Sequence, residues 1–291
     1  MYHSPKLTPE EYRQEWLSGL HQTEYNACRF AEDKTKFAVD WLLKQNPEIN
    51  LVEPKNILDR ICWCKIYDKD PRKPLWTDKI NANYMLHELG LDELIIEPVY
   101  FSRGYLTRAE YDALPDGKYI IKCNHGSGWN IKFHKNKLFD PAYMISKIHE
   151  WYDLNFAYIS GYEWQYENII PGIIIQPDFG ILLNWEFYCE NGNIEGVNLI
   201  RKEGKNWQQC IAWVDENGNA PKFSLGQEAY CNFLSAKEKI ILEKMKPYVK
   251  KLAQDFKFVR VDLYSINTEI KFSELTFSPC GGFMRYREYE S

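Results

Sequence analysis

The sequence predicts an α+β fold, in which helices alternate with antiparallel β-hairpins. Three hairpins are predicted, with strands at 118–123 and 129–133, at 182–189 and 194–200, and at 258–264 and 269–275. The turn at 190–193 contains an Asn-Gly pair, which favours a tight hairpin connection. Long helices are predicted at 141–154 and 235–256. Because neighbouring strands are joined by short turns, this order indicates antiparallel sheets and not a doubly wound parallel sheet.

Before residue 118 the sequence predicts helices followed by short strands. The helices span 8–45, 54–69 and 77–89, and short strands are predicted at 94–96, 99–101 and, further along, 173–176. Residues 8–11 suit a helix start, because Thr is a good N-cap, Pro fits the first helical position and acids fit the first turn. The prolines in 70–74 break the second helix, and Gly90 ends the third.

Composition limits the class of protein. The chain has 291 residues, 45% of them hydrophobic, so it can bury a large core in one domain or two coupled lobes. Thirty-six Lys and Arg against 41 Asp and Glu give 36 − 41 = −5, which argues against binding nucleic acid through bulk charge. Aromatic residues, at 15%, suit sugar binding, although most are expected in the core.

The sequence also predicts a cytoplasmic protein. No stretch approaches the roughly 20 apolar residues that cross a bilayer. Residues 1–16 lack the apolar region of a signal peptide. The eight cysteines are scattered without a C-x-x-C pair, so we expect reduced and mostly buried thiols.

The first candidate site is Lys122 with the loop that follows it, 124–128. A Lys at the end of a buried strand is unfavourable unless its ammonium meets an anion. The loop contains two glycines and a Ser, which let backbone N–H groups approach phosphate oxygens. It is neither a Walker loop nor a dinucleotide fingerprint, since a strand follows it and not a helix. An ordinary hairpin turn explains the same residues equally well.

The second candidate site is a pair of carboxylates, Asp262 and Glu274, on the last predicted hairpin. A short turn joins the two strands, so these acids should lie close together across the hairpin. Two buried carboxylates repel each other and need a cation or a shared proton. Mg²⁺ with a nucleotide phosphate would satisfy them. The alternative is a salt bridge to Arg260 or Lys271.

Two weaker signals for a binding site come from Lys79 and from residues 176–180, and several known catalytic motifs are absent. Lys79 starts a helix, where a phosphate would be favourable, although an exposed Lys is the simpler interpretation. The apolar strand that runs into 176–180 resembles a hinge whose backbone could contact an adenine. No H-x₃-H pair or G-x-S-x-G elbow is present, so zinc and serine-hydrolase signatures are missing.

Taken in order, these motifs resemble the TupA-like ATP-grasp family, whose members occur in bacterial gene clusters for cell-surface polysaccharides. The segments that carry the resemblance are 59–68, 78–79, 122–128, 163–169, 258–264 and 273–279. It covers about residues 54–287. It implies two α+β lobes with antiparallel sheets that clasp ATP and Mg²⁺. The division would be a helical extension at 1–50, an N-terminal lobe at 51–116, a phosphate-loop subdomain at 117–178 and a metal-binding subdomain at 179–291.

The resemblance also implies residue roles. Phosphate contacts would come from Lys79, Lys122 and a flexible loop made of Asn124, His125, Gly126, Ser127 and Gly128. The adenine hinge would include Gln176 and Asp178, and the Mg²⁺ ligands would be Asp262, Glu274 and Thr276. Arg260 and Arg201 would hold the acyl phosphate. Two positions depart from the family pattern, because Gln176 replaces an acid and Glu186, near the nucleotide, replaces a Lys. Residues 201–230, with Trp207 and Trp213, are expected to form a variable loop at the substrate pocket.

The function implied is an ATP-dependent carboxylate–amine ligase that forms an amide through an acyl phosphate. Its substrates would be a small or sugar-linked carboxylate and amine, with a sugar acid or an amino acid joined to a capsular or O-antigen sugar. The protein would act in the bacterial cytoplasm, near the inner face of the membrane, and a homo-oligomer is left open. Two alternatives remain: a glycosyltransferase that uses a nucleotide sugar, and a catalytically impaired nucleotide-binding scaffold.

Overall fold

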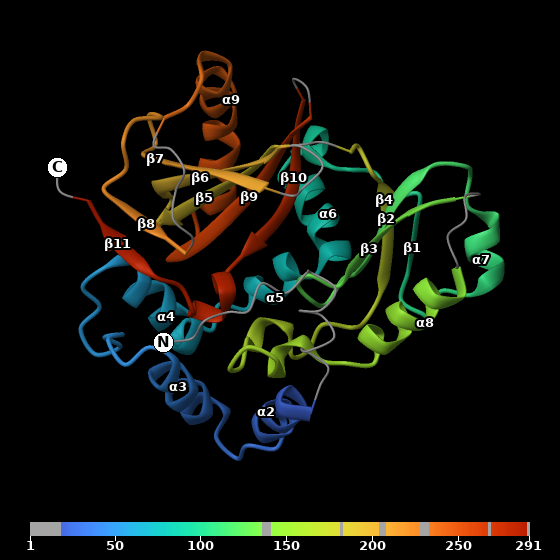
Figure 1. The fold of residues 1–291 in the computed structure, drawn as a ribbon, viewed down its shortest axis with the longest axis horizontal. Coiled ribbons are helices and arrows are strands. Elements are labelled where there is room, and N and C mark those ends of the chain that lie inside the picture. The colour runs from blue at the N-terminus through green and yellow to red at the C-terminus, as the bar shows by residue number, and fades with distance from the viewer. Residues whose placement is uncertain are drawn as a thin grey trace.

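The computed structural model describes residues 19–135, 141–180, 183–203, 208–226, 233–266 and 269–289. In this part of the chain the predicted α+β fold is confirmed, with helices around separate antiparallel sheets (Figure 1). A five-stranded sheet has the order β10-β9-β5-β6-β7, where these strands are β5 (Leu183–Glu190), β6 (Asn193–Glu203), β7 (Gln208–Val214), β9 (Phe258–Ile266) and β10 (Glu269–Thr276). A four-stranded sheet has the order β1-β4-β2-β3, with β1 (Tyr100–Ser102), β2 (Lys118–Cys123), β3 (Asn130–His134) and β4 (Ile173–Pro177).

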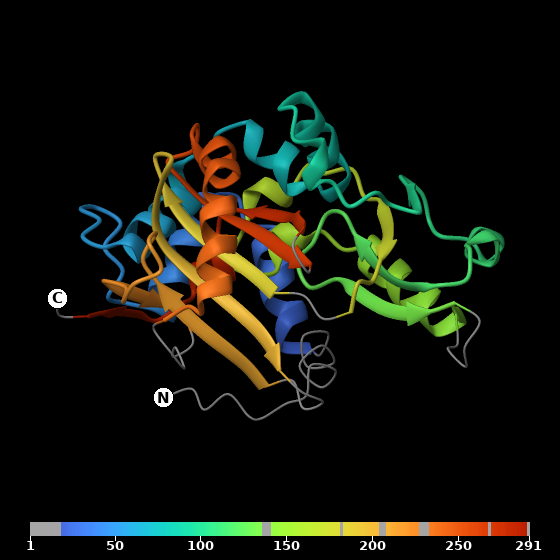
Figure 2. The same cartoon turned by 90° about the horizontal axis from the view of Figure 1, so that it is seen from above.

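The five-stranded sheet is covered differently on its two faces. Helix α9 (Ala236–Ala253) lies across one face, as Figure 2 shows, and packs on apolar side chains such as Val261 and Leu263 of β9. Helix α4 (Ile57–Tyr67) packs on the other face, near Tyr188 and Phe258. Because alternate residues of a strand point to opposite faces, the second face also receives the even-numbered polar residues of β9.

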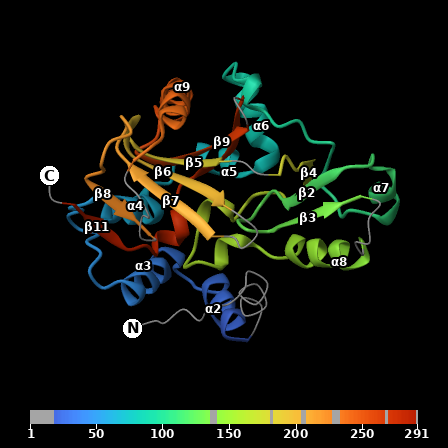
Figure 3. The same cartoon turned by 45° about the horizontal axis from the view of Figure 1, so that its top comes forward.

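The four-stranded sheet has a core of its own. Helix α8 (Pro141–Tyr152) lies along it, and the short helix α7 (Arg108–Ala113) caps its outer end (Figure 3). The chain passes from this sheet to the five-stranded sheet between β4 and β5. Strands β8 (Phe223–Leu225) and β11 (Tyr286–Glu288) form a separate two-stranded pair. The division of the chain at 50, 116 and 178 stays a prediction.

The single helix predicted over 8–45 is wrong within the described residues. The structure has α2 (Gly19–Arg29) and α3 (Lys34–Gln45), separated by a break at 30–33. Asp33 causes the new start, because its carboxylate accepts a hydrogen bond from the backbone N of Lys36 as an N-cap. The helix start predicted at 8–11 lies outside the described residues.

Other boundaries shift for local reasons. The predicted break at 70–74 is the start of a short helix, α5 (Arg72–Thr77), after which α6 (Lys79–Glu88) begins. Residues 92–94 form a 3₁₀ turn where a strand was expected at 94–96. Within 201–230 the structure places β7 and β8, so the variable-loop prediction is wrong there, and Trp213 is buried in the core. Trp207 lies outside the described residues. No helix in the described part of the chain is both long enough and apolar enough to span a membrane.

A left-handed turn near α3 predicts the effect of one substitution. Gly161 has a φ of +60°, and a Cβ there would lie 2.1 Å from the Trp41 ring. Gly161→Ala should therefore lower the free energy of unfolding by about 3 kcal/mol, through backbone strain and overpacking together. Gly90→Ala is the matched control, since its φ is +64° but nothing lies within 4 Å of the added carbon. Urea denaturation should show a loss of about 1 kcal/mol for the control, and equal losses would contradict the packing argument.

Candidate active site

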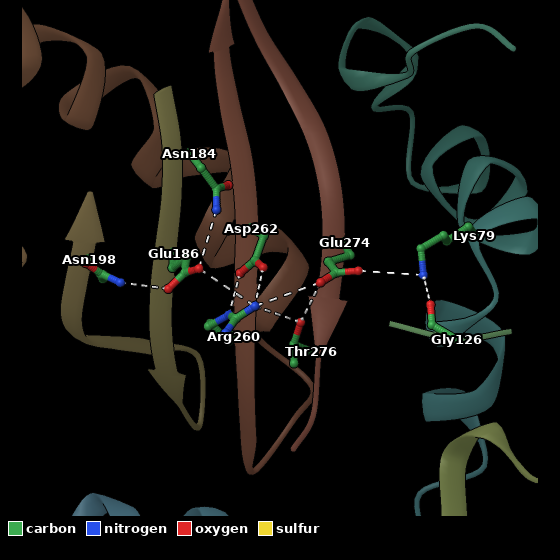
Figure 4. A network of polar contacts seen from close by, with 9 residues as sticks. All are labelled: Lys79, Gly126, Asn184, Glu186, Asn198, Arg260, Asp262, Glu274 and Thr276. Atoms are coloured by element: carbon green, nitrogen blue, oxygen red, sulfur yellow. Dashed lines mark hydrogen bonds and ion pairs between the residues drawn. The ribbon is translucent and has the colours of Figure 1, made fainter. Parts of the chain in front are cut away.

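Three carboxylates form a row across the five-stranded sheet. Glu186 on β5 lies opposite Asp262 on β9, and Asp262 lies opposite Glu274 on β10. Residues directly opposite each other share a face of the sheet, so the three side chains project to the same side (Figure 4). A β-bulge between Phe272 and Glu274 makes this possible, because the extra residue, Ser273, turns Glu274 toward Asp262. The predicted antiparallel pairing of Asp262 with Glu274 is confirmed.

The guanidinium of Arg260 is the cation among these carboxylates. Its Nε and Nη2 donate to the two oxygens of Asp262 at 2.7 and 2.5 Å. Nη2 also lies 3.9 Å from Oε1 of Glu186 and 3.9 Å from Oε1 of Glu274. The sequence left open whether Asp262 meets a metal or a salt bridge, and the structure shows the salt bridge to Arg260. Lys271 instead donates to backbone oxygens of another segment.

The row has more negative than positive charge in a buried place. One guanidinium and three carboxylates give 1 − 3 = −2, and only 3% of the Asp262 side chain is exposed. Burial raises the pKa of Asp262 well above its usual value; Arg260 opposes this effect, and Glu186 and Glu274 add to it. Burial would raise the pKa of Glu274 too, but nearby cations, Lys79 foremost, hold it below its ordinary value.

The donor atoms of the row are of the kind that Mg²⁺ takes, namely carboxylate and hydroxyl oxygens. Thr276 Oγ1 donates to Oε1 of Glu274 and accepts from Nη2 of Arg260, both at 3.3 Å. Within the described residues, no three His, Cys, Asp or Glu side chains are arranged to hold a metal ion. The row therefore matches a divalent cation in ligand type alone, because its carboxylates are not arranged as a metal-binding group and Arg260 is their counter-ion in this structure.

Glu186 is held by neutral groups on its far side. Asn198 on β6 donates to Oε2 of Glu186 at 2.8 Å, and Asn184 donates to Oε1 at 3.4 Å. Glu186, which was expected to depart from the family pattern, is thus the end of the carboxylate row.

Lys79 approaches the row from α6. Its Nζ donates to the backbone oxygen of Gly126 at 2.7 Å and lies 3.7 Å from Oε2 of Glu274 (Figure 4). Only 17% of its side chain is exposed, so the interpretation as a solvent-exposed Lys is wrong. Lys79 instead joins the loop at 124–128 to the end of the carboxylate row.

Lys122 lines a narrow cavity between α6, β2, β4 and β10. Its Nζ donates to Oε1 of Gln176 at 3.0 Å, and both side chains line this cavity together with Lys79 and Glu274. The cavity has a volume of about 20 Å³. A single water needs roughly 10–15 Å³ on this measure, so the cavity must widen to admit a nucleotide. Burial, with Lys79 nearby, lowers the pKa of Lys122 to about 8.

The loop that follows β2 has a buried root and an exposed tip. The buried residues are Asn124, His125 and Gly126, and the exposed ones are Ser127 and Gly128. Burial lowers the pKa of His125 to about 4, so its imidazole is neutral at pH 7 and adds no positive charge. A Cβ on Gly126 would lie 2.2 Å from the Trp129 ring, which explains the glycine there. The tip is thus the part of the loop exposed to a ligand.

Asp178 and Arg201 are not brought to the cavity. Asp178 accepts hydrogen bonds from Lys132 Nζ at 2.8 Å and from the backbone N of Gly180 at 3.1 Å, and so holds the turn between the sheets. Arg201 is on the face of β6 that packs against α9, and donates to both oxygens of Glu238 at 2.6 and 3.0 Å. Strand alternation therefore places Arg201 on the opposite side of the sheet from Arg260.

The segment 163–169, which contributed to the family resemblance, holds the chain beyond β10. Glu163 accepts a hydrogen bond from the Ser278 hydroxyl, and Gln165 Nε2 donates to Oγ of Ser278 at 2.7 Å. Ser278 precedes a turn in which Cys280 has a left-handed φ of +49°, a strain of about 1 kcal/mol or more. Sequence reasoning gave these residues no role, because Glu163 and Ser278 are 115 positions apart. The one available signal was a cluster of polar residues in an otherwise apolar motif.

Comparison with known proteins gives a family match. A family model described as TupA-like ATPgrasp matches residues 59–291, more than half of the chain. No curated protein matches the chain significantly.

Solved structures with a similar course of the chain are distant. D-alanyl-alanine synthetase A from Vibrio cholerae is 13% identical, with a TM-score of 0.42 over 70% of this chain. D-alanine–D-alanine ligase from Helicobacter pylori is 15% identical, with a TM-score of 0.41 over 72%. The ATP-grasp ligase PsnB complexed with a minimal precursor is 11% identical, with a TM-score of 0.39 over 75%. The match covers 56%, 56% and 59% of those chains respectively, so this chain spans less than two thirds of their length.

The counter-ion role of Arg260 predicts an order of stabilities. Arg260→Met should lower the free energy of unfolding by about 3–5 kcal/mol, because it leaves the buried Asp262 and Glu186 without a cation, whereas Glu274 keeps Lys79. Asp262→Asn should cost about 1–3 kcal/mol, since Arg260 keeps the other two carboxylates. Arg108→Met, which removes an exposed pair with Asp112, should change stability by less than about 1 kcal/mol. Urea denaturation measures all three, and an Arg260→Met protein as stable as Asp262→Asn would refute the role.

Proposed function

We propose that this chain, which belongs to the TupA-like ATP-grasp family, is an ATP-dependent ligase that joins a carboxylate to an amine. The observation that carries the proposal is the cavity at which Lys79, Lys122 and Glu274 meet. These residues come from α6, β2 and β10, so three separate elements bring two cations and one anion to one place. Such a set suits a phosphate chain with its metal, because lysines bind phosphate oxygens and carboxylates bind metal.

In this proposal each element of the site has a role. Lys79 and Lys122 neutralise charge on the phosphates of ATP, and Ser127 and Gly128 at the loop tip approach them with backbone N–H groups. Gln176 lies where the chain leaves the four-stranded sheet and contacts the adenine end. Positioning and charge neutralisation supply most of the catalysis in phosphoryl transfer, so a rigid set of cations is the main requirement.

Mg²⁺ would be held by Asp262, Glu274 and Thr276, with Glu186 as the neighbouring acid. Bound there, it would neutralise phosphate charge during transfer of the phosphoryl group to the substrate carboxylate. Arg260 is the residue proposed to hold the resulting acyl phosphate, since it lies at the centre of the row. Arg201 is not part of this proposal, because it faces α9 and is paired with Glu238.

The proposed substrates rest only on the gene clusters in which members of the family occur. A sugar acid or an amino acid, joined through an amide to a capsular or O-antigen sugar, is the class we propose. Incubation with ATP, Mg²⁺ and a panel of uronic acids and amines, followed by measurement of ADP, would identify a productive pair. Absence of ATP binding by calorimetry at millimolar concentration would overturn the proposal.

A second candidate is a nucleotide-binding scaffold without turnover. The observations that favour it are the neutral Gln176 beside Lys122 and the acid Glu186 where the family pattern has a Lys. It predicts ATP binding with no ADP release for any pair of acceptors.

The carboxylate row should be essential for turnover. Asp262→Asn and Glu274→Gln should each reduce Mg²⁺-dependent ADP release at least about a hundredfold, roughly 2.7 kcal/mol of barrier, because each removes a metal ligand. Glu150→Gln is a suitable control, since that carboxylate is half exposed and pairs with Lys147 within the same helix, α8. Normal turnover in the folded fraction of either variant would show that the row is structural.

ATP affinity should depend on pH through Lys122. The pKa of about 8 means that Lys122 is charged below pH 8 and loses its proton above it. Affinity should therefore fall by no more than about twofold between pH 7 and 8 and by up to about tenfold for each further pH unit. Calorimetry from pH 7 to 9.5 would measure this profile.

Lys122→Arg provides the control for this pH profile. An arginine keeps its charge throughout the range, so the variant should bind ATP with a flat profile. An unchanged affinity of the wild-type protein up to pH 9.5, or the same decline in both proteins, would contradict the assignment of Lys122.

A further inference from the structure

Asp78 is a buried carboxylate directly before Lys79, and four donors from three segments point at it. Its Oδ1 accepts from the backbone N of Ile80 at 2.9 Å and of Asn81 at 3.3 Å, which caps the start of α6. The same oxygen accepts from Nδ2 of Asn124 at 2.8 Å. Its Oδ2 pairs with Nη2 of Arg103 at 2.8 Å. Only 4% of the side chain is exposed, whereas a simple N-cap needs one or two backbone bonds and leaves its second oxygen to water.

Asn124 fixes the root of the loop to the same carboxylate. Besides its bond to Asp78, Nδ2 donates to the backbone oxygen of Ile170 at 3.0 Å, and its backbone N donates to the oxygen of Gly172 at 3.0 Å. The backbone oxygen of Asn124 accepts from the backbone N of Lys79 at 3.3 Å. The start of α6 and the root of the loop are therefore joined by a side-chain bond and a backbone bond.

Lys79 closes this connection at its other end. Its Nζ donates to the backbone oxygen of Gly126, near the tip of the loop whose root Asp78 holds. The carboxylate of Asp78 also lies at the N-terminus of α6, where a negative charge is favourable and offsets the cost of placing Lys79 there. Asp78 thus sets the position of Lys79 and the direction of the loop at the same time.

We propose that Asp78 is a positioning residue that holds Lys79 and the loop 124–128 as one unit for binding nucleotide phosphates. This inference rests on the proposed function, because it takes the loop and Lys79 to be the phosphate contacts. Arg103 is the counter-ion that permits the buried carboxylate, and it is tied in turn to the backbone oxygen of Ile170 at 2.6 Å. Asp78 touches no substrate and acts only through Lys79 and Asn124.

The test separates positioning from helix capping. Asp78→Ala and Asp78→Asn are compared with Asp33→Ala, which removes the N-cap of α3, where the carboxylate accepts from the backbone N of Lys36 at 2.8 Å. Calorimetry on the full chain measures the affinity of each protein for ATP with Mg²⁺ and for adenosine, which lacks phosphates. Asp78→Ala should weaken ATP binding at least tenfold and leave adenosine binding unchanged, and Asp78→Asn should have a smaller effect of the same kind. Asp33→Ala should lower the melting temperature without changing either affinity.

The possible outcomes separate this inference from the proposed function. If the wild-type protein binds no ATP, the proposed function fails. If the wild-type protein binds ATP and the Asp78 variants bind it equally well, or lose ATP and adenosine affinity in the same proportion, the positioning role is refuted and the proposed function stands. Should Asp78→Ala fail to fold, the isosteric Asp78→Asn decides the question by the same ratio of affinities. An Asn124→Ala variant should reproduce the loss, and the double variant with Asp78→Asn should lose less than the sum of the two.

Discussion

The guanidinium of Arg260 is the group on which the arrangement of the site depends. It is the positive charge placed among three carboxylates that come from three different strands. A buried ion pair adds little net stability compared with apolar packing, but removal of one partner leaves uncompensated charge at a high cost. The strands β5, β9 and β10 can therefore keep their acids aligned only with a cation between them. The remaining negative charge is the property on which the proposed Mg²⁺ site rests.

The site has two layers of opposite charge. The anionic layer belongs to the five-stranded sheet, and the cationic layer consists of Lys79 on α6 and Lys122 on β2. The small volume of the cavity between them shows that the layers are nearly in contact in this structure. The direct partner of Lys122 is the neutral Gln176, and burial with Lys79 nearby lowers the pKa of this lysine, an effect that Glu274 opposes only in part. A bound phosphate chain would separate the layers and satisfy both.

Local pairing could be predicted from the sequence, and nonlocal pairing could not. The pairing of Asp262 with Glu274 could be predicted from the sequence, because a short turn joins their strands. The place of Glu186 in the same row depends on β5 lying beside β9, and nothing in the local sequence specifies this neighbour. The prediction that Arg201 belongs to the site was wrong for a related reason. A shift of one position along β6 changes the face to which a side chain points.

The helix boundaries that were missed have similar explanations. The break between α2 and α3 contains no Pro or Gly, and it depends on one capping carboxylate, Asp33. In 201–230 the alternation that forms β7 is short, and its burial becomes clear only once Trp213 packs beside Tyr188. The contacts of Glu163 and Asp78 also join distant segments, so their roles follow from the tertiary structure and not from periodicity.

The register of the carboxylate row has a consequence for folding. The β9–β10 hairpin brings Asp262 and Glu274 together over a short stretch of chain, but Glu186 must find Asp262 across 262 − 186 = 76 positions. A slip of one residue would turn Glu186 into the apolar face that packs on α9, where a lone charge is strongly disfavoured. Misaligned pairing of β5 therefore costs more free energy with Glu186 at this position than it would with an apolar residue. The acids of the site consequently favour the native register of the sheet while the chain folds.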